Sequence, residues 1–201
     1  MFKIFFDFIV SLIILIILSP LFLIISIIIL LESGFPVFHK RTVHLNDKET
    51  FNFFKFRTMQ LNADKILQSL LENNKEIRDE YDKFFKIKND PRITKSGKFL
   101  RKTSLDELPQ IFNVLMMQMS LVGPRPKTPD ELKKFFQNSD YQTLFSVKPG
   151  ITCTWQVSGR SNISYSERRK LDLDYAKNRN FFLDLRILFM TIFVPFKRNA
   201  Y

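Results

Sequence analysis

The chain is short of several residue types, and each shortage excludes a class of protein. Its 201 residues contain one cysteine, Cys153, so an internal disulfide is impossible and no Cys/His cluster exists to hold zinc. A lone cysteine fits a reducing, cytosol-facing compartment. Only 5 glycines are present, which excludes collagen-like and glycine-rich architectures. In contrast, 23 phenylalanines and an apolar content of 45% exclude a disordered chain.

Acidic residues are also scarce. Asp and Glu number 20 against 31 Lys and Arg, which gives a formal net charge of +11. The excess is concentrated in residues 84–102, where Asp90 is the only acid. Such a patch predicts an anionic partner, such as nucleotide phosphates or lipid head groups, and a merely solvated face is the alternative. We expect no nucleic-acid partner, because no nucleic-acid-binding motif matches.

Charged residues are missing altogether from Phe8 to Leu31. This run of Ile, Leu, Phe and Val exceeds the roughly 20 residues that span a bilayer. A cleaved signal peptide is a poor alternative, because its apolar core would be shorter and a small-residue cleavage site would follow. The run therefore predicts a membrane segment.

Ser19 and Pro20 interrupt this segment near its middle. Proline removes a backbone donor, so we expect a kink there, and serine hydroxyls can bond the freed carbonyls. Basic residues flank both ends, Lys3 on one side and Lys40 and Arg41 on the other. Because positive flanks favour the cytoplasmic side, a re-entrant hairpin of two half-helices and a single spanning helix both stay open.

Between the membrane segment and the C-terminus, the patterns predict an α+β fold with more helix than strand. Strands are expected at 37–40 and 50–56, helices at 62–88, 105–119, 129–137 and 164–177, and a turn followed by a strand within 147–157. The apolar stretch 181–196 is too short and too charged to span a membrane. It suits an amphipathic helix in the membrane interface or a core helix.

Paired carboxylates follow the basic patch. Ser104 and Glu107 have the spacing of a capping box, and Pro109 is tolerated only near a helix start, so Asp106 and Glu107 are expected in a first helical turn. The helix dipole and nearby cations would favour the ionised form of both carboxyls. An ionised Asp can attack phosphorus or bind magnesium, although capping alone is the simpler interpretation.

Three cations strengthen the chemical interpretation. Lys55 and Arg57 are two residues apart, which places both on one face of a strand. Arg125 lies in the stiff sequence Gly-Pro-Arg-Pro, as a bidentate phosphate clamp requires. Together with the carboxylates and a membrane segment, they indicate a diphosphate substrate at the bilayer surface.

The order and spacing of these motifs resemble the bacterial sugar transferase family, the monotopic polyprenyl-phosphate phosphoglycosyl transferases. The charged stretch 62–88 resembles the branch that includes undecaprenyl-phosphate galactose and glucose phosphotransferases. The matching pieces are KFRTM (55–59), NDPRITKSGKFLRKTSLDELPQIFNVL (89–115), MSLVGPRP (119–126), VKPGITCTWQVSGR (147–160) and LDLDYAKN (171–178).

The resemblance implies a reaction. A sugar-1-phosphate, galactose or glucose by branch, passes from a UDP-sugar to undecaprenyl phosphate with Mg²⁺, giving undecaprenyl-diphospho-sugar and UMP. This is the first membrane step of a surface glycan such as lipopolysaccharide, capsule or exopolysaccharide. Asp106 would be the nucleophile that forms an aspartyl-phosphosugar, and Glu107 would help to hold Mg²⁺ and the phosphates. The other matching positions are Lys55, Arg101, Arg125 as a phosphate contact, Asp172, and Arg160 as a nucleotide contact.

The resemblance also implies how the chain is organised. Residues 1–34 would form a re-entrant anchor broken at Ser19-Pro20. Residues 35–201 would form a catalytic domain on the cytoplasmic face of the bacterial inner membrane, with a membrane-associated helix at about 181–196. Cys153 replaces a glycine of the family, and it would be strained if the position needs a positive φ.

Two rival functions are consistent with parts of the sequence. A non-enzymatic, membrane-anchored module could bind anionic ligands through the basic patch. A hydrolase could form the same aspartyl-phosphate and pass it to water.

Overall fold

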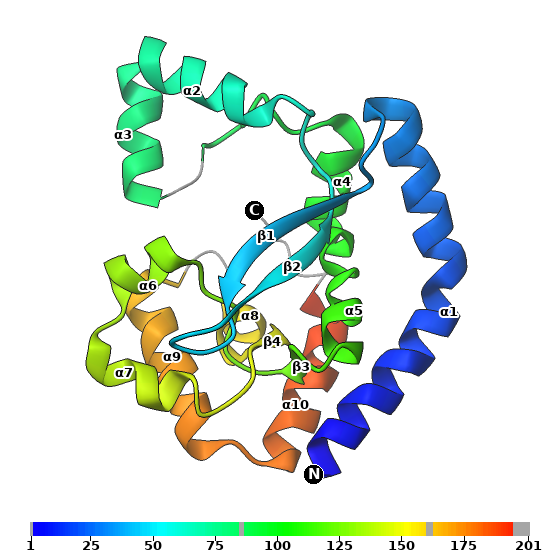
Figure 1. Cartoon of the computed structure of the whole chain (residues 1–201), viewed down its shortest axis with the longest axis vertical. Coiled ribbons are helices and arrows are strands. Elements are labelled where there is room, and N and C mark those ends of the chain that lie inside the picture. The colour runs from blue at the N-terminus through cyan, green and yellow to red at the C-terminus, as the bar shows by residue number, and fades with distance from the viewer. Residues whose placement is uncertain (1, 85–86, 160–162, 195–201) are drawn as a thin grey trace.

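The computed structural model describes residues 2–84, 87–159 and 163–194, and it confirms a mostly helical α+β fold (Figure 1). In chain order the elements are α1 (Phe2–Ser33), β1 (Phe38–His44), β2 (Thr50–Phe56), α2 (Ala63–Asn73), α3 (Lys75–Phe84), α4 (Lys95–Thr103), the 3-10 turn η1 (Leu105–Glu107), α5 (Gln110–Leu115), β3 (Ser120–Val122), α6 (Pro129–Phe135), α7 (Asn138–Leu144), β4 (Gly150–Thr152), α8 (Thr154–Ser158), α9 (Tyr165–Asn178) and α10 (Phe181–Ile192).

Helix α1 runs along one side of the molecule (Figure 1). Among the described residues it is the one helix long and apolar enough to cross a membrane. Its outer face exposes large aliphatic side chains, with Ile17 68% and Leu31 84% exposed. Its inner face buries Phe22, Ile25 and Ile29 in a cluster that also contains Phe56 and Leu100. Helix α1 is therefore part of the hydrophobic core as well as a candidate membrane segment.

The structure corrects the expected break at Ser19-Pro20. Helix α1 is one continuous element with Pro20 inside it, in place of two half-helices. Proline 20 cannot donate to the carbonyl of Ile16, four residues earlier. The Ser19 hydroxyl bonds that carbonyl instead, at 2.8 Å, as expected for a serine beside a proline. The helix curves around the rest of the protein (Figure 1), and its helical conformation is kept through the proline.

Two small sheets occupy the centre. Strand β2 has its predicted bounds and pairs antiparallel with β1, which is longer than predicted, in the register Phe38 with Phe56 and His44 with Thr50. Strands β3 and β4 form a parallel pair. The sequence pattern does not reveal β3, a strand of three residues that follows directly after the stretch 105–119, which the apolar pattern predicts as helix. That stretch instead contains η1, α5 and a loop before β3.

The predicted helices 129–137 and 164–177 correspond to α6 and α9. The charged stretch 62–88 is two helices, because Asn74 ends α2 in an extended conformation and its side chain accepts from the Ile77 backbone N–H. The α2–α3 hairpin projects away from the two sheets (Figure 1).

Cys153 follows β4 and is buried, with 1% of its surface exposed. Its φ of −148° is ordinary extended backbone, so a cysteine is accommodated without strain. The conformational reason to expect a glycine at this position is therefore absent.

Candidate active site

The two adjacent carboxylates lie at a corner between helices. Ser104 ends α4 with φ 61°, and its side chain makes no capping hydrogen bond, so the predicted capping box is wrong. Asp106 and Glu107 lie in η1, and α5 begins only at Gln110, after Pro109. Pro109 thus marks the start of α5, as predicted, and the two carboxylates lie in the first turn of the short 3-10 element η1 that precedes it.

Two cations from distant elements converge on these carboxylates. Lys55 of β2 places its Nζ 2.8 Å from Glu107 Oε1 and 3.7 Å from Asp106 Oδ2. The guanidinium of Arg125 binds Glu107 bidentately, with NH1 donating to Oε2 at 3.1 Å and NH2 donating to Oε1. The ring of Phe53 lies 5.5 Å from the Lys55 ammonium and 5.9 Å from the Arg125 guanidinium carbon. The structure thus brings two of the predicted cations, Lys55 and Arg125, to the two predicted carboxylates.

The two carboxyls differ in their electrostatics. Burial alone would raise the pKa of Glu107, but the charges and hydrogen bonds of Arg125 and Lys55 outweigh it and hold that pKa far below the usual range. Burial raises the pKa of Asp106, and the charge of Glu107 adds to this against the opposing pull of Lys55. The expectation that the surroundings favour the ionised form holds for Glu107 and is wrong for Asp106. Asp106 is thus the more basic carboxylate of the pair, and Lys55 and Arg125 compensate its charge less closely than that of Glu107.

Asn113 fixes the strand that carries Lys55. It is fully buried on α5, its Oδ1 accepts from the Phe54 backbone N–H at 3.1 Å, and its Nδ2 donates to the Asn52 carbonyl at 2.7 Å. These bonds join the edge of β2 to α5 on both sides of Phe53. Asn113 is not among the predicted site residues. The available signal is a polar residue within an apolar stretch, because buried polar groups need partners.

Arg101 joins the site and Arg57 does not. Arg101, in the last turn of α4, donates from Nε to Thr58 Oγ1 at 2.9 Å, and its charge acts on Asp106. Arg57 bonds the end of α1 through the Ser33 carbonyl at 2.7 Å, the Ser33 hydroxyl at 2.8 Å and the Gly34 carbonyl. The interpretation of Lys55 and Arg57 as one phosphate-binding face is wrong, because β2 ends at Phe56 and the alternation of the strand ends with it.

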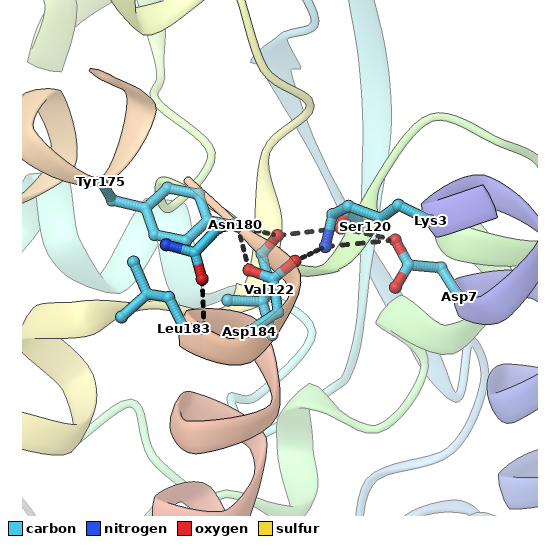
Figure 2. A network of polar contacts seen from close by, with 8 residues as sticks. All are labelled: Lys3, Asp7, Ser120, Val122, Tyr175, Asn180, Leu183 and Asp184. Carbon is cyan, nitrogen blue, oxygen red and sulfur yellow. Dashed lines mark hydrogen bonds and ion pairs between the residues drawn. The ribbon is translucent and has the colours of Figure 1, made fainter. Parts of the chain in front are cut away.

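The loop that carries Arg125 is held at both of its ends by α9. Asp172 is buried and pairs with Lys127, with 2.7 Å between Oδ2 and Nζ. One turn later on the same helix, the Tyr175 hydroxyl lies 3.1 Å from the carbonyl oxygen of Val122 (Figure 2). Asp172 therefore positions the loop instead of contacting the carboxylates. Arg160, the predicted nucleotide contact, lies outside the described residues.

The two carboxylates of η1 would supply only part of the coordination of a magnesium ion. Within residues 2–84, 87–159 and 163–194, no three His, Cys, Asp or Glu side chains cluster to form an all-protein metal site. Mg²⁺ is commonly held by one or two carboxylates together with substrate phosphates. Asp106 and Glu107 provide two adjacent carboxylates, of which Glu107 already accepts from both Lys55 and Arg125.

The chain matches a known protein family along almost its whole length. The model of the bacterial sugar transferase family matches residues 1–198, so the chain belongs to this family. It is 45% identical over 195 residues to the undecaprenyl-phosphate galactose phosphotransferase of Salmonella typhimurium, an alignment that covers 97% of this chain and 40% of that protein.

Two further relatives differ in length. The UDP-glucose:undecaprenyl-phosphate glucose-1-phosphate transferase of Escherichia coli is 34% identical over 96% of this chain and 40% of its own length. The exopolysaccharide production protein ExoY of Rhizobium meliloti is 40% identical over 93% of this chain and 82% of its own length. The chain thus spans about two fifths of the longer relatives and most of the shorter one.

Proposed function

We propose that this protein transfers a sugar-1-phosphate, galactose or glucose, from a UDP-sugar to undecaprenyl phosphate, giving undecaprenyl-diphospho-sugar and UMP. The observation that carries the proposal is the contrast at η1, where Glu107 is bound by two cations while burial leaves Asp106 basic. The names of the Salmonella and Escherichia relatives support the substrate classes, since both include undecaprenyl phosphate and a hexose or its phosphate.

In the proposed first step, a carboxylate oxygen of Asp106 attacks the β-phosphorus of the UDP-sugar. The bond from that phosphorus to the bridging oxygen breaks, its electron pair leaves with UMP, and an aspartyl-phosphosugar remains. In the second step, an oxygen of undecaprenyl phosphate attacks the same phosphorus, and the bond to Asp106 breaks to restore the carboxylate. One nucleophile thus serves a soluble and a membrane substrate in turn.

The cations of the site would act on charge and position, which dominate phosphoryl transfer. Arg125 and Lys55 are pre-oriented by Glu107 and would face the diphosphate, and Arg101 would offset charge beside Asp106. A bound Mg²⁺, held by Asp106 and Glu107 together with the phosphates, would supply further charge neutralisation.

The function is tested by UMP release from a panel of UDP-sugars, with Mg²⁺ and undecaprenyl phosphate, using protein in lipid nanodiscs. We expect repeated turnovers of UMP release from UDP-galactose or UDP-glucose only when undecaprenyl phosphate is present. Release of free sugar phosphate without the lipid would identify the hydrolase instead. No UMP from folded protein would favour the non-enzymatic module.

We further propose that both ends of the continuous helix α1 lie at the cytoplasmic face of the bacterial inner membrane, so that α1 enters and leaves the membrane on that one face, and that α10 lies in the interface. Both ends of α1 contact the same domain, since Lys3 donates to Asp184 on α10 at 2.6 Å and Ile29 is buried beside Phe56. A helix that crossed the bilayer would carry Lys3 to the opposite side, away from Asp184. Helix α10 exposes Phe182, at 82%, and buries its other face.

The topology can be tested with single cysteines, because the native Cys153 is buried. We expect Phe2→Cys and Lys40→Cys to be protected in intact cells from an impermeant maleimide and to be labelled together after the inner membrane is opened. Labelling of Phe2→Cys alone from outside would show a spanning helix. Both positions are exposed in the structure, so protection reports membrane sidedness.

Asp172 gives a test of loop positioning. Burial raises the pKa of Asp172 despite the opposing charge of Lys127, so the pair adds little to stability and Asp172→Asn should unfold near the wild-type temperature. We expect its turnover to fall ten- to a hundredfold, because small displacements of a substrate-positioning group have effects of that order. The measurement is UMP release at saturating UDP-sugar. The exposed Asp174→Asn on the same helix is the control, and wild-type turnover in Asp172→Asn would contradict the assignment.

A further inference from the structure

A pocket separate from the candidate active site opens where α1 and α10 begin. Its volume is about 440 Å³, within the range of small-molecule sites. None of Asp106, Glu107, Lys55 and Arg125 lines it. Its walls come from α1, β3, α9, the start of α10 and residues 146–148, and they include Lys3, Ser120, Lys148, Tyr175, Arg179 and Phe181.

The polar wall of this pocket is fixed by a network that spans three helices and a strand (Figure 2). Asp184 accepts from Lys3 and from the Tyr175 hydroxyl, each at 2.6 Å. Asp7 accepts from the Ser120 hydroxyl at 2.6 Å and lies 3.7 Å from Lys3. Both carboxylates therefore have donors within the protein, which leaves the other charged groups of the wall to meet a ligand.

Those other groups are cationic. Lys148 and Arg179 line the pocket, and with Lys3 they outnumber its two carboxylates, Asp7 and Asp184. Lys148 uses one of its three donors on the Met117 carbonyl, at 2.6 Å, and Arg179 is exposed at the rim. The pocket is thus suited to an anionic group.

The rest of the wall is apolar and continues onto the membrane-facing elements. Phe2, Ile4 and Phe181 line the pocket, and the rings of Phe2 and Phe181 meet edge to face at 5.2 Å. Phe2 is 66% exposed, and the neighbouring Phe182 is 82% exposed. A ligand here would have a charged head beside Lys148 and Arg179 and an apolar part beside these rings.

We propose that this pocket binds the phosphate headgroup of an anionic phospholipid, whose acyl chains run along the exposed faces of α1 and α10. A free phosphate compound would use the cations but not the apolar wall that is continuous with both helices. The lipid would hold the starts of α1 and α10 at headgroup level, independently of the sugar-phosphate chemistry at η1.

The test measures lipid retained by the full-length protein. The protein is first reconstituted in nanodiscs of phosphatidylcholine that contain a fraction of phosphatidylglycerol. It is then transferred into detergent, and the lipids that remain bound are counted by native mass spectrometry. We expect the wild type to keep phosphatidylglycerol in preference to phosphatidylcholine. The double variant Lys148→Gln/Arg179→Gln should lose retention at least fivefold, since one cation near an anionic surface contributes a factor of about five.

A matched control separates the pocket from general surface charge. Lys170→Gln/Lys177→Gln removes the same charge from exposed positions of α9 that do not line the pocket, and it should retain lipid like the wild type. A third variant, Ser146→Trp, fills the pocket without a change of charge and should also lose retention.

Three results would overturn the proposal. Equal loss in the control double variant would show attraction to surface charge alone, and equal retention of phosphatidylcholine would show no headgroup preference. Displacement of the lipid by the same concentration of glycerol phosphate would identify a site for a soluble phosphate ester. Lipid retention needs no UDP-sugar, so the outcome is independent of whether the proposed transfer reaction is correct.

Discussion

Replacing Asp106 with asparagine is expected to abolish lipid-dependent UMP release and to leave the protein at least as stable as the wild type. Loss of a covalent nucleophile costs about a thousandfold or more in turnover. The stability follows from linkage: the folded-state pKa of Asp106 lies above its unfolded value, so ionising it in the folded protein is unfavourable. This free-energy cost of ionisation is absent at a pH below the unfolded-state pKa and is complete at a pH above the folded-state pKa. Asparagine cannot ionise, so the substitution removes the cost.

The measurement combines UMP release with thermal unfolding at neutral and acidic pH. The advantage of Asp106→Asn in melting temperature should be largest at neutral pH and shrink as the pH falls through the raised pKa. Asp79→Asn, an exposed carboxylate on α3, makes the same change of charge and should alter neither quantity. Normal turnover in Asp106→Asn would refute the proposed nucleophile, and a large drop in its melting temperature would refute the electrostatic account.

Glu107→Gln is expected to change stability in the opposite direction. Its folded-state pKa is depressed, so its stabilising contribution is present above the ordinary glutamate pKa of about 4.3 and is lost as the pH falls toward the folded value. Gln leaves the guanidinium of Arg125 and the ammonium of Lys55 without their anionic partner. Breaking a fully buried ion pair in this way costs about 3–5 kcal/mol, and we expect a loss toward the lower end because about a fifth of each side chain is exposed.

Denaturant unfolding of the two proteins across the pH range checks this. The gap between wild type and Glu107→Gln should be widest at neutral pH and narrow in acid, and turnover should also fall because Arg125 loses its orientation. Glu76→Gln, an exposed substitution on α3, should unfold like the wild type. If Glu107→Gln is as stable as the wild type at neutral pH, the two cations do not depend on Glu107.

The parts of the site that the sequence predicted are those set by local motifs. Asp106 and Glu107 are adjacent in the chain, and the stiff loop around Arg125 is visible as Gly-Pro-Arg-Pro. The meeting of these pieces follows from the resemblance to a family, since no local pattern places β2 beside η1. Lys55 reaches Glu107 because Asn113 fixes β2 to α5, which is a contact between residues far apart in the chain.

The wrong predictions have physical causes that a local pattern does not contain. The expected pairing of Lys55 with Arg57 requires the strand to continue, and it ends at Phe56. The expected ionisation of Asp106 follows from nearby cations, but burial, which only the tertiary structure reveals, is the largest influence on its pKa. The parallel pair β3 and β4 depends on chain segments that lie about thirty residues apart, which short-range periodicity does not detect.

The double role of α1 has a consequence for how the protein can be made. Ile25 and Ile29 pack in the same cluster as Phe56 and Leu100, so removing α1 would expose a hydrophobic surface beside the strand that carries Lys55. A version trimmed of its anchor to make it water-soluble would therefore lose part of its interior and aggregate. The choice of detergent is limited in a similar way. A detergent that displaces the inner face of α1 from its core contacts would inactivate the protein, whereas one that covers only the outer face would preserve it.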